Sequence, residues 1–103
     1  MSSPTSRSLA LLRSQGYVAD VVERFNSFTK RRNDFLGIGD IIGLGPDVVI
    51  VQTTSGSNVS ARLKKIEASE HIDAIRKAGV RVIVHGWAKK ANGRWACREI
   101  DVS

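Results

Sequence analysis

The stretch Val48–Thr54, with the sequence VVIVQTT, decides the fold of this chain. Six of its seven residues are β-branched, which favours a strand over a helix. The apolar run at its start is typical of a strand that is covered on both faces of a sheet. Turn residues at Gly45–Asp47 precede the run, and Ser55–Asn58 ends the pattern. We therefore expect Val48–Thr54 to be the central strand of a layered α/β domain.

The segments on either side of this strand predict an α-β-β-β-α-β-β order. Helices are expected over Ser6–Gln15, before Gly16, and over Ser60–Ala78, before Gly79. Strands are expected over Tyr17–Phe25, Leu36–Leu44 and Val80–Trp87, with a polar, basic loop over Asn26–Asp34.

A β-hairpin is expected at the C-terminal end, because Asn92-Gly93 favours a two-residue type I′ turn. That turn would place Lys90 opposite Trp95 and Trp87 opposite Arg98, with a cation beside each indole. Packing within the hairpin accounts for both tryptophans, and stacking on unpaired bases is the alternative.

Composition indicates one compact domain over residues 1–103, with residues 1–5 as a loose tail. The chain has 16 Lys+Arg against 10 Asp+Glu, a net charge of +6, which predicts polyanionic partners. Its single cysteine, Cys97, excludes an internal disulfide framework and a multi-cysteine zinc site. No apolar run is long enough for a membrane span, and Met1–Arg13 lacks the pattern of a secretory signal. These features predict an intracellular, cytoplasmic protein that does not act at a membrane.

Asp40 is the first candidate for chemistry, because it lies inside the apolar stretch Gly37–Ile42. A buried carboxylate is costly unless it is paired, hydrogen-bonded or bound to a cation. The alternative is an aspartate at a bend that accepts backbone N–H groups. Gln52 and Thr54 are two residues apart in the central strand, so they share a face, and the neighbouring strand would bring Asp40 close to them.

These features resemble the PD-(D/E)XK nuclease superfamily, and within it the archaeal-type Holliday junction resolvases. In chain order, the similar segments are the strand entry at Gly16-Tyr17, the basic loop Lys30-Arg31-Arg32, Asp40-Ile41-Ile42, and Val49–Thr54. The resemblance runs from Ser6 to about Trp87. It implies a restriction-endonuclease-like α-β-β-β-α-β core followed by the hairpin. It also implies a small Mg²⁺- or Mn²⁺-dependent DNA endonuclease that is selective for branched DNA. Because a domain this small cannot enclose a duplex alone, a homodimer is expected.

The resemblance assigns roles residue by residue. Asp40 matches the family's metal-binding aspartate, Gln52 stands at its glutamate position, and Thr54 stands at its lysine position. Asp40, Gln52 and Thr53 would hold the metal, although hard cations prefer a carboxylate to the Gln52 amide. Glu23 would restore the missing carboxylate as a further catalytic residue, or else be an exposed residue paired with Arg24.

Six basic residues are expected to contact DNA phosphates: Lys30, Arg31, Arg32, Arg62, Lys64 and Lys65. The last three could also supply the positive charge that Thr54 lacks. Six phosphate contacts predict a slope of about −5 for log affinity against log salt. Two alternatives stay open: a catalytically degenerate nuclease-fold module that binds nucleic acid or protein, and an α+β module whose basic surface meets an acidic protein.

The remaining candidates for chemistry stand alone in the sequence. His71 and His85 have no Cys or His at ligand spacing, so a helix-surface role and a strand-pairing role are expected for them. Cys97 is expected to be a small packed residue of the last strand.

Overall fold

The computed structural model describes residues 3–103, apart from the side chains of Phe25, Asn26, Arg31 and Arg32. The helical elements are α1 (Pro4–Ser14), η1 (Gly56–Asn58), α2 (Val59–Glu67) and α3 (Ile72–Lys77). The strands are β1 (Val18–Val21), β2 (Arg24–Asn26), β3 (Arg31–Asn33), β4 (Ile41–Leu44), β5 (Val48–Ser55), β6 (Arg81–Lys89) and β7 (Trp95–Asp101).

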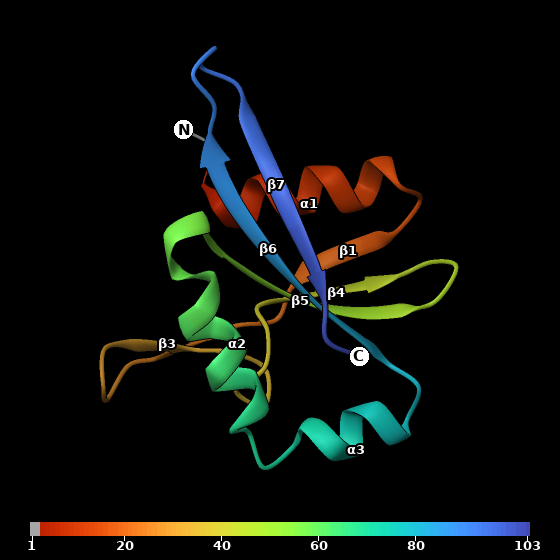
Figure 1. Ribbon diagram of the computed structural model, residues 1–103. Helices are drawn as coiled ribbons and strands as arrows, with labels where there is room; N and C mark the ends of the chain where they lie inside the picture. Colours follow the sequence, from red (N-terminus) through yellow and green to blue (C-terminus); the bar gives the residue numbers. More distant parts are fainter. Residues whose placement is uncertain (1–2) are drawn as a thin grey trace.

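Five strands form one mixed sheet in the order β1-β4-β5-β6-β7, and β2 and β3 form a separate two-stranded ribbon. Strands β5 and β6 are parallel, whereas the other neighbours in the main sheet are antiparallel. Helices α2 and α3 make the crossover between the parallel pair, and the β6–β7 hairpin ends the chain (Figure 1). The α/β class, the N-terminal helix and the C-terminal hairpin are therefore confirmed, with β5 central as expected.

Alternate residues of β5 supply two cores on opposite faces of the sheet. Val49 and Val51 pack with residues of α1, including the buried Leu12. Ile50 packs on the other face, in the cluster that holds Ile66 and the buried isoleucines of α3. Because successive side chains of a strand alternate, Thr53 belongs to the α1 face, and Gln52 and Thr54 belong to the α2 face.

Both helical segments differ from the prediction at their ends. Helix α1 begins at Pro4, because Ser3 is its N-cap and forms a capping box with Ser6. Residues 4 and 5 are therefore helical and not a tail, while residues 1 and 2 lie outside the described part. The predicted single helix over Ser60–Ala78 is two helices, because the Ser69 hydroxyl accepts the His71 N–H and offers the backbone an alternative to the helix.

The first two predicted strands are shorter than expected. The strand predicted over Tyr17–Phe25 ends at Val21, and the chain then enters the β2–β3 ribbon, so most of Asn26–Asp34 is a hairpin and not a plain loop. The strand predicted over Leu36–Leu44 begins only at Ile41. Positive φ angles at Leu36 (53°) and Gly37 (70°) turn the chain before it.

The C-terminal hairpin forms where predicted, but the predicted pairing register differs from the observed one by one residue. Trp95 lies opposite Lys89, and Trp87 lies opposite Cys97 and not Arg98. The loop has three residues, because the Gly93 N–H donates to the Lys90 carbonyl while the Lys90 N–H donates to the Arg94 carbonyl. Of these loop residues only Gly93 has a positive φ (83°), whereas a type I′ turn needs two.

Candidate functional site

Asp40 lies where three strands of the main sheet meet. Its backbone N–H donates to the Val51 carbonyl at 3.0 Å, and its carbonyl accepts the Val22 N–H at 2.9 Å. Its carboxylate accepts the Thr53 N–H and the Thr53 hydroxyl, each at 3.1 Å. The side chain is buried at 6% exposure. Asp40 lies at a bend and accepts a backbone N–H, which is the arrangement of the alternative interpretation, and Thr53 is its direct partner.

Glycine at position 39 allows this close approach. A Cβ built there would lie 2.9 Å from the Val51 carbonyl oxygen and 2.5 Å from the Ile50 side chain. Both neighbours belong to the central strand, so a larger residue would push the start of β4 away from β5. The side chain of Asp40, the next residue, would then lose its reach to Thr53.

Two further carboxylates converge on Asp40 from different segments. Phe35 and Gly39 form an isolated antiparallel bridge, so the residues flanking it, Asp34 and Asp40, come to lie beside each other. Glu23 arrives from the continuation of β1, just after Val22 bonds to Asp40. One oxygen from each of Glu23, Asp34 and Asp40 lies within 4.8 Å of the other two. We call these three residues the acidic triad.

The environment of the Asp40 carboxylate disfavours its charged form. The pKa of Asp40 is raised to about 6, chiefly by burial and to a lesser extent by the negative charges of Asp34 and Glu23, against the hydrogen bonds from Thr53, which lower it. One cation offsets part of this charge, since the Lys65 Nζ lies 2.7 Å from Asp34 Oδ2. Lys65 comes from α2, so the helix after the central strand contributes directly to the site.

Among the described residues, neither Gln52 nor Thr54 forms a hydrogen bond with the Asp40 carboxylate. The Gln52 Nε2 donates to the Thr53 carbonyl, and its Oε1 is buried without a hydrogen-bond partner in the described part of the chain. Thr54 is buried and follows Gln52 on the α2 face. Of the predicted catalytic and metal-binding residues, the structure therefore brings together Asp40, Thr53 and Glu23.

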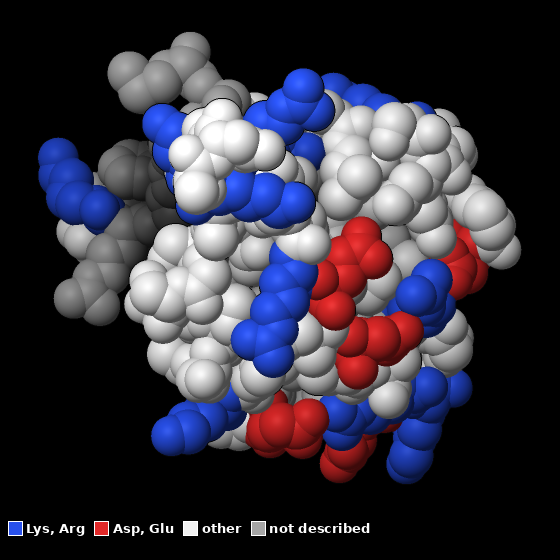
Figure 2. Space-filling model, turned by 45° about the horizontal axis from the view of Figure 1, so that its top comes forward, with Lys and Arg blue, Asp and Glu red and all other residues white. Residues whose placement is uncertain are grey.

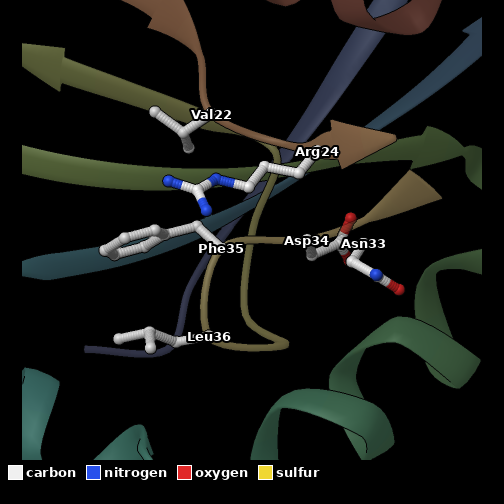
Figure 3. A pocket seen from close by; sticks show the side chains of 6 residues that line it. All are labelled: Val22, Arg24, Asn33, Asp34, Phe35 and Leu36. Atoms are coloured by element: carbon white, nitrogen blue, oxygen red, sulfur yellow. The ribbon is translucent and has the colours of Figure 1, made fainter. Parts of the chain in front are cut away.

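A pocket of about 350 Å³ adjoins the acidic triad and shares Asp34 with it. Its lining consists of Val22, Arg24, Asn33, Asp34, Phe35 and Leu36. In Figure 3 the Arg24 side chain runs between Val22 and Phe35, with its guanidinium on the pocket side. The pocket thus offers a cation and an apolar wall beside a carboxylate.

The predicted phosphate-binding residues lie on two elements. Arg62, Lys64 and Lys65 belong to α2, and the last two are exposed. Lys30 is exposed in the turn of the β2–β3 ribbon, with a positive φ of 58°, while the side chains of Arg31 and Arg32 lie outside the described set. The ribbon extends away from the main sheet (Figure 1), and its turn exposes 96% of Phe28. An aromatic ring beside a cation suits contact with unstacked bases.

Basic and acidic side chains are interspersed on the face shown in Figure 2, without one unbroken basic patch. The excess positive charge, +6 for the whole chain, therefore does not form a single patch on this face. Any phosphate binding on this face would rely on particular residues and less on a broad field.

Asp34 is the site residue that the sequence prediction missed. Its signal is the pair of aspartates around Phe35-Leu36-Gly37-Ile38-Gly39, because a tight turn between them brings the two carboxylates together.

Comparisons of the chain with protein-family models, curated proteins and solved structures gave no match. Within the described residues, no helix has the length and apolar character to cross a membrane.

Proposed function

We propose that this chain is a small metal-dependent DNA endonuclease with a restriction-endonuclease-like core. The observation that carries the proposal is the acidic triad, which is built from three segments around a buried aspartate and has Lys65 at its edge. Carboxylates crowd together in proteins at a cost that a bound cation removes. The element order and the basic composition support the same proposal.

The residues present fit a hard divalent cation. Glu23, Asp34 and Asp40 offer only oxygen donors, which Mg²⁺ and Mn²⁺ prefer. The Gln52 Oε1, buried without a hydrogen-bond partner among the described residues, is a further oxygen donor on the central strand. When bound, the metal would neutralise charge on a scissile phosphate and lower the pKa of a coordinated water.

The chain's own residues have separate roles in this proposal. Thr53 holds the Asp40 carboxylate in one orientation through two hydrogen bonds. Lys65 supplies the positive charge that Thr54 lacks, and its Nζ has further N–H donors for a phosphate oxygen besides the one directed at Asp34. Arg24 lines the adjoining pocket, where it can bind the next phosphate along the DNA strand.

Selectivity for branched DNA and a homodimer belong to the same proposal. A chain of 103 residues presents one acidic triad, so cutting two strands of a junction requires two copies. The exposed Phe28 on the projecting ribbon would stack on bases that a branch point leaves unpaired.

One observation favours a second function. Gln52 and Thr54 stand where the resembled nucleases have a glutamate and a lysine, and neither hydrogen bonds to Asp40. A catalytically degenerate module that binds nucleic acid without cutting it is therefore the alternative.

Incubation with branched, single-stranded and duplex DNA, with and without Mn²⁺, tests both functions. Wild type should cut branched DNA only with the metal, and Asp40→Asn should abolish cutting while DNA binding persists. Asp73→Asn is the matched control, because it makes the same change at an exposed aspartate of α3. DNA binding without cutting would favour the degenerate module. Affinity no greater than that of an unrelated protein of charge +6 would overturn both.

A further inference from the structure

A second cluster of possible metal ligands lies on the β6–β7 hairpin, away from the acidic triad. His85 lies directly opposite Glu99, and Cys97 lies two residues before Glu99 on the same strand face. The side chains of His85, Cys97 and Glu99 each offer a ligand atom within 4.8 Å of the other two. In the sheet order β1-β4-β5-β6-β7, this cluster lies on the last two strands, whereas Asp40 lies at the start of β4, on the other side of β5.

The imidazole of His85 is fully buried and is held in one orientation from the α1 side. Its Nδ1 lies 2.8 Å from the Ser8 Oγ, which also accepts the Trp87 indole N–H at 2.9 Å. The two rings of His85 and Trp87 meet edge to face, with their planes at 88°. Ser8 itself is buried in α1, so the helix fixes the ring against the hairpin.

The other ring nitrogen lacks a hydrogen bond. Within the described part of the chain the His85 Nε2 is buried without a hydrogen-bond partner, and it lies 3.4 Å from Glu99 Oε1. A buried polar atom with no partner is costly, which calls for an explanation at this position. Histidines that bind metals use one ring nitrogen as the ligand and donate the other N–H to an outer partner, which is the arrangement that Ser8 offers.

We propose that His85, Cys97 and Glu99 form a second metal site, which takes a borderline ion such as Zn²⁺ and not Mg²⁺. A nitrogen, a sulfur and an oxygen donor suit Zn²⁺, whereas Mg²⁺ takes oxygen donors almost alone. Binding replaces the thiol proton of Cys97, which leaves to solvent, with a sulfur–metal bond. Three protein ligands leave a fourth position for water. The ion would fasten the hairpin beneath α1, independently of the proposed nuclease activity.

Cobalt(II) substitution on the full chain, in the presence of excess Mg²⁺, tests this site. Wild type should bind one Co²⁺ with a thiolate charge-transfer band, and Zn²⁺ should displace the cobalt and erase the band. Cys97→Ala should remove the band, and Glu99→Gln, at a half-exposed position, should weaken binding at least tenfold. Ser8→Ala should weaken it by about 10–100-fold, as the loss of an outer partner does.

Two control variants locate the ion. His71→Asn removes the other histidine, which lies outside the cluster, and Asp40→Asn alters the acidic triad; both should leave the cobalt spectrum unchanged. Circular dichroism of each variant verifies that it is folded. Absence of the charge-transfer band in folded wild type, or its persistence in Cys97→Ala, would overturn the proposal. The 3.4 Å contact between His85 and Glu99 would then be a cross-strand pair only.

Discussion

Replacing Asp40 with asparagine should stabilise the metal-free protein at neutral and alkaline pH. The pKa of Asp40 is raised from 3.8 to about 6, chiefly by burial. A tenfold change in an acid dissociation constant corresponds to about 1.4 kcal/mol, so the charged form costs about 3 kcal/mol of folding free energy above pH 6. Asparagine has nearly the same shape, can still accept the Thr53 N–H, and carries no charge to bury.

The sign of the pH dependence follows from the raised pKa of Asp40. Below pH 3.8 the carboxyl is protonated in the folded and the unfolded chain, so its charge costs nothing. Between pH 3.8 and about 6 the unfolded chain loses its proton first, and wild-type stability falls. Above about pH 6 the penalty is constant. The stability difference between Asp40→Asn and wild type should therefore grow from near zero at pH 3.5 to an upper limit of about 3 kcal/mol at pH 8.

Urea unfolding in the presence of EDTA, from pH 3.5 to pH 8, measures this difference. Titrating groups that do not act on Asp40, such as Asp47 and Asp101 with their lowered pKa values, are common to both proteins and cancel in the comparison. Added Mn²⁺ should then stabilise wild type but not the variant. A variant destabilised by the same amount at every pH would refute the reasoning, because Asp40 would then serve as a structural hydrogen-bond acceptor only.

Three other substitutions test neighbouring parts of the site. Lys65→Met should lower the cleavage rate at least tenfold but cost under about 1 kcal/mol in urea unfolding, since the Lys65 side chain is half-exposed; Lys64→Met is its control. Gln52→Glu should tighten Mn²⁺ binding in calorimetry, and an unchanged affinity would remove Gln52 from the metal ligands. Gly39→Ala should cost about 1–3 kcal/mol in urea unfolding, because its Cβ would lie 2.9 Å from the Val51 carbonyl oxygen; unaltered stability would contradict that close approach.

The main sheet was predictable because its strongest signals are local. The β-branched run at Val48–Thr54 fixes β5 by itself, and Gly79 separates the crossover helices from β6. The ribbon β2–β3 was not predictable in this way, since its polar and basic residues resemble those of a loop. Its strands gain stability from pairing with each other, which single-residue preferences do not report.

The candidate site was only half predictable, because pairing register decides which side chains meet. Glu23 was anticipated as an extra carboxylate near Asp40, and the structure places it there. Asp34 was missed, because the segment Leu36–Leu44 was predicted as one strand and the tight turn between Asp34 and Asp40 was not recognised. The one-residue error at Asn92-Gly93 had a similar effect, since it moved Glu99 away from His85 and hid the second cluster.

The most direct test of the acidic triad is an anomalous difference map from crystals of the wild-type protein soaked in Mn²⁺. We expect one strong peak among the carboxylates of Glu23, Asp34 and Asp40, at bonding distance from at least two of them, and its loss in crystals of Asp40→Asn. Soaked crystals with no peak there, or with manganese only at other surface carboxylates, would contradict the claim that these three residues hold the metal on which cleavage depends.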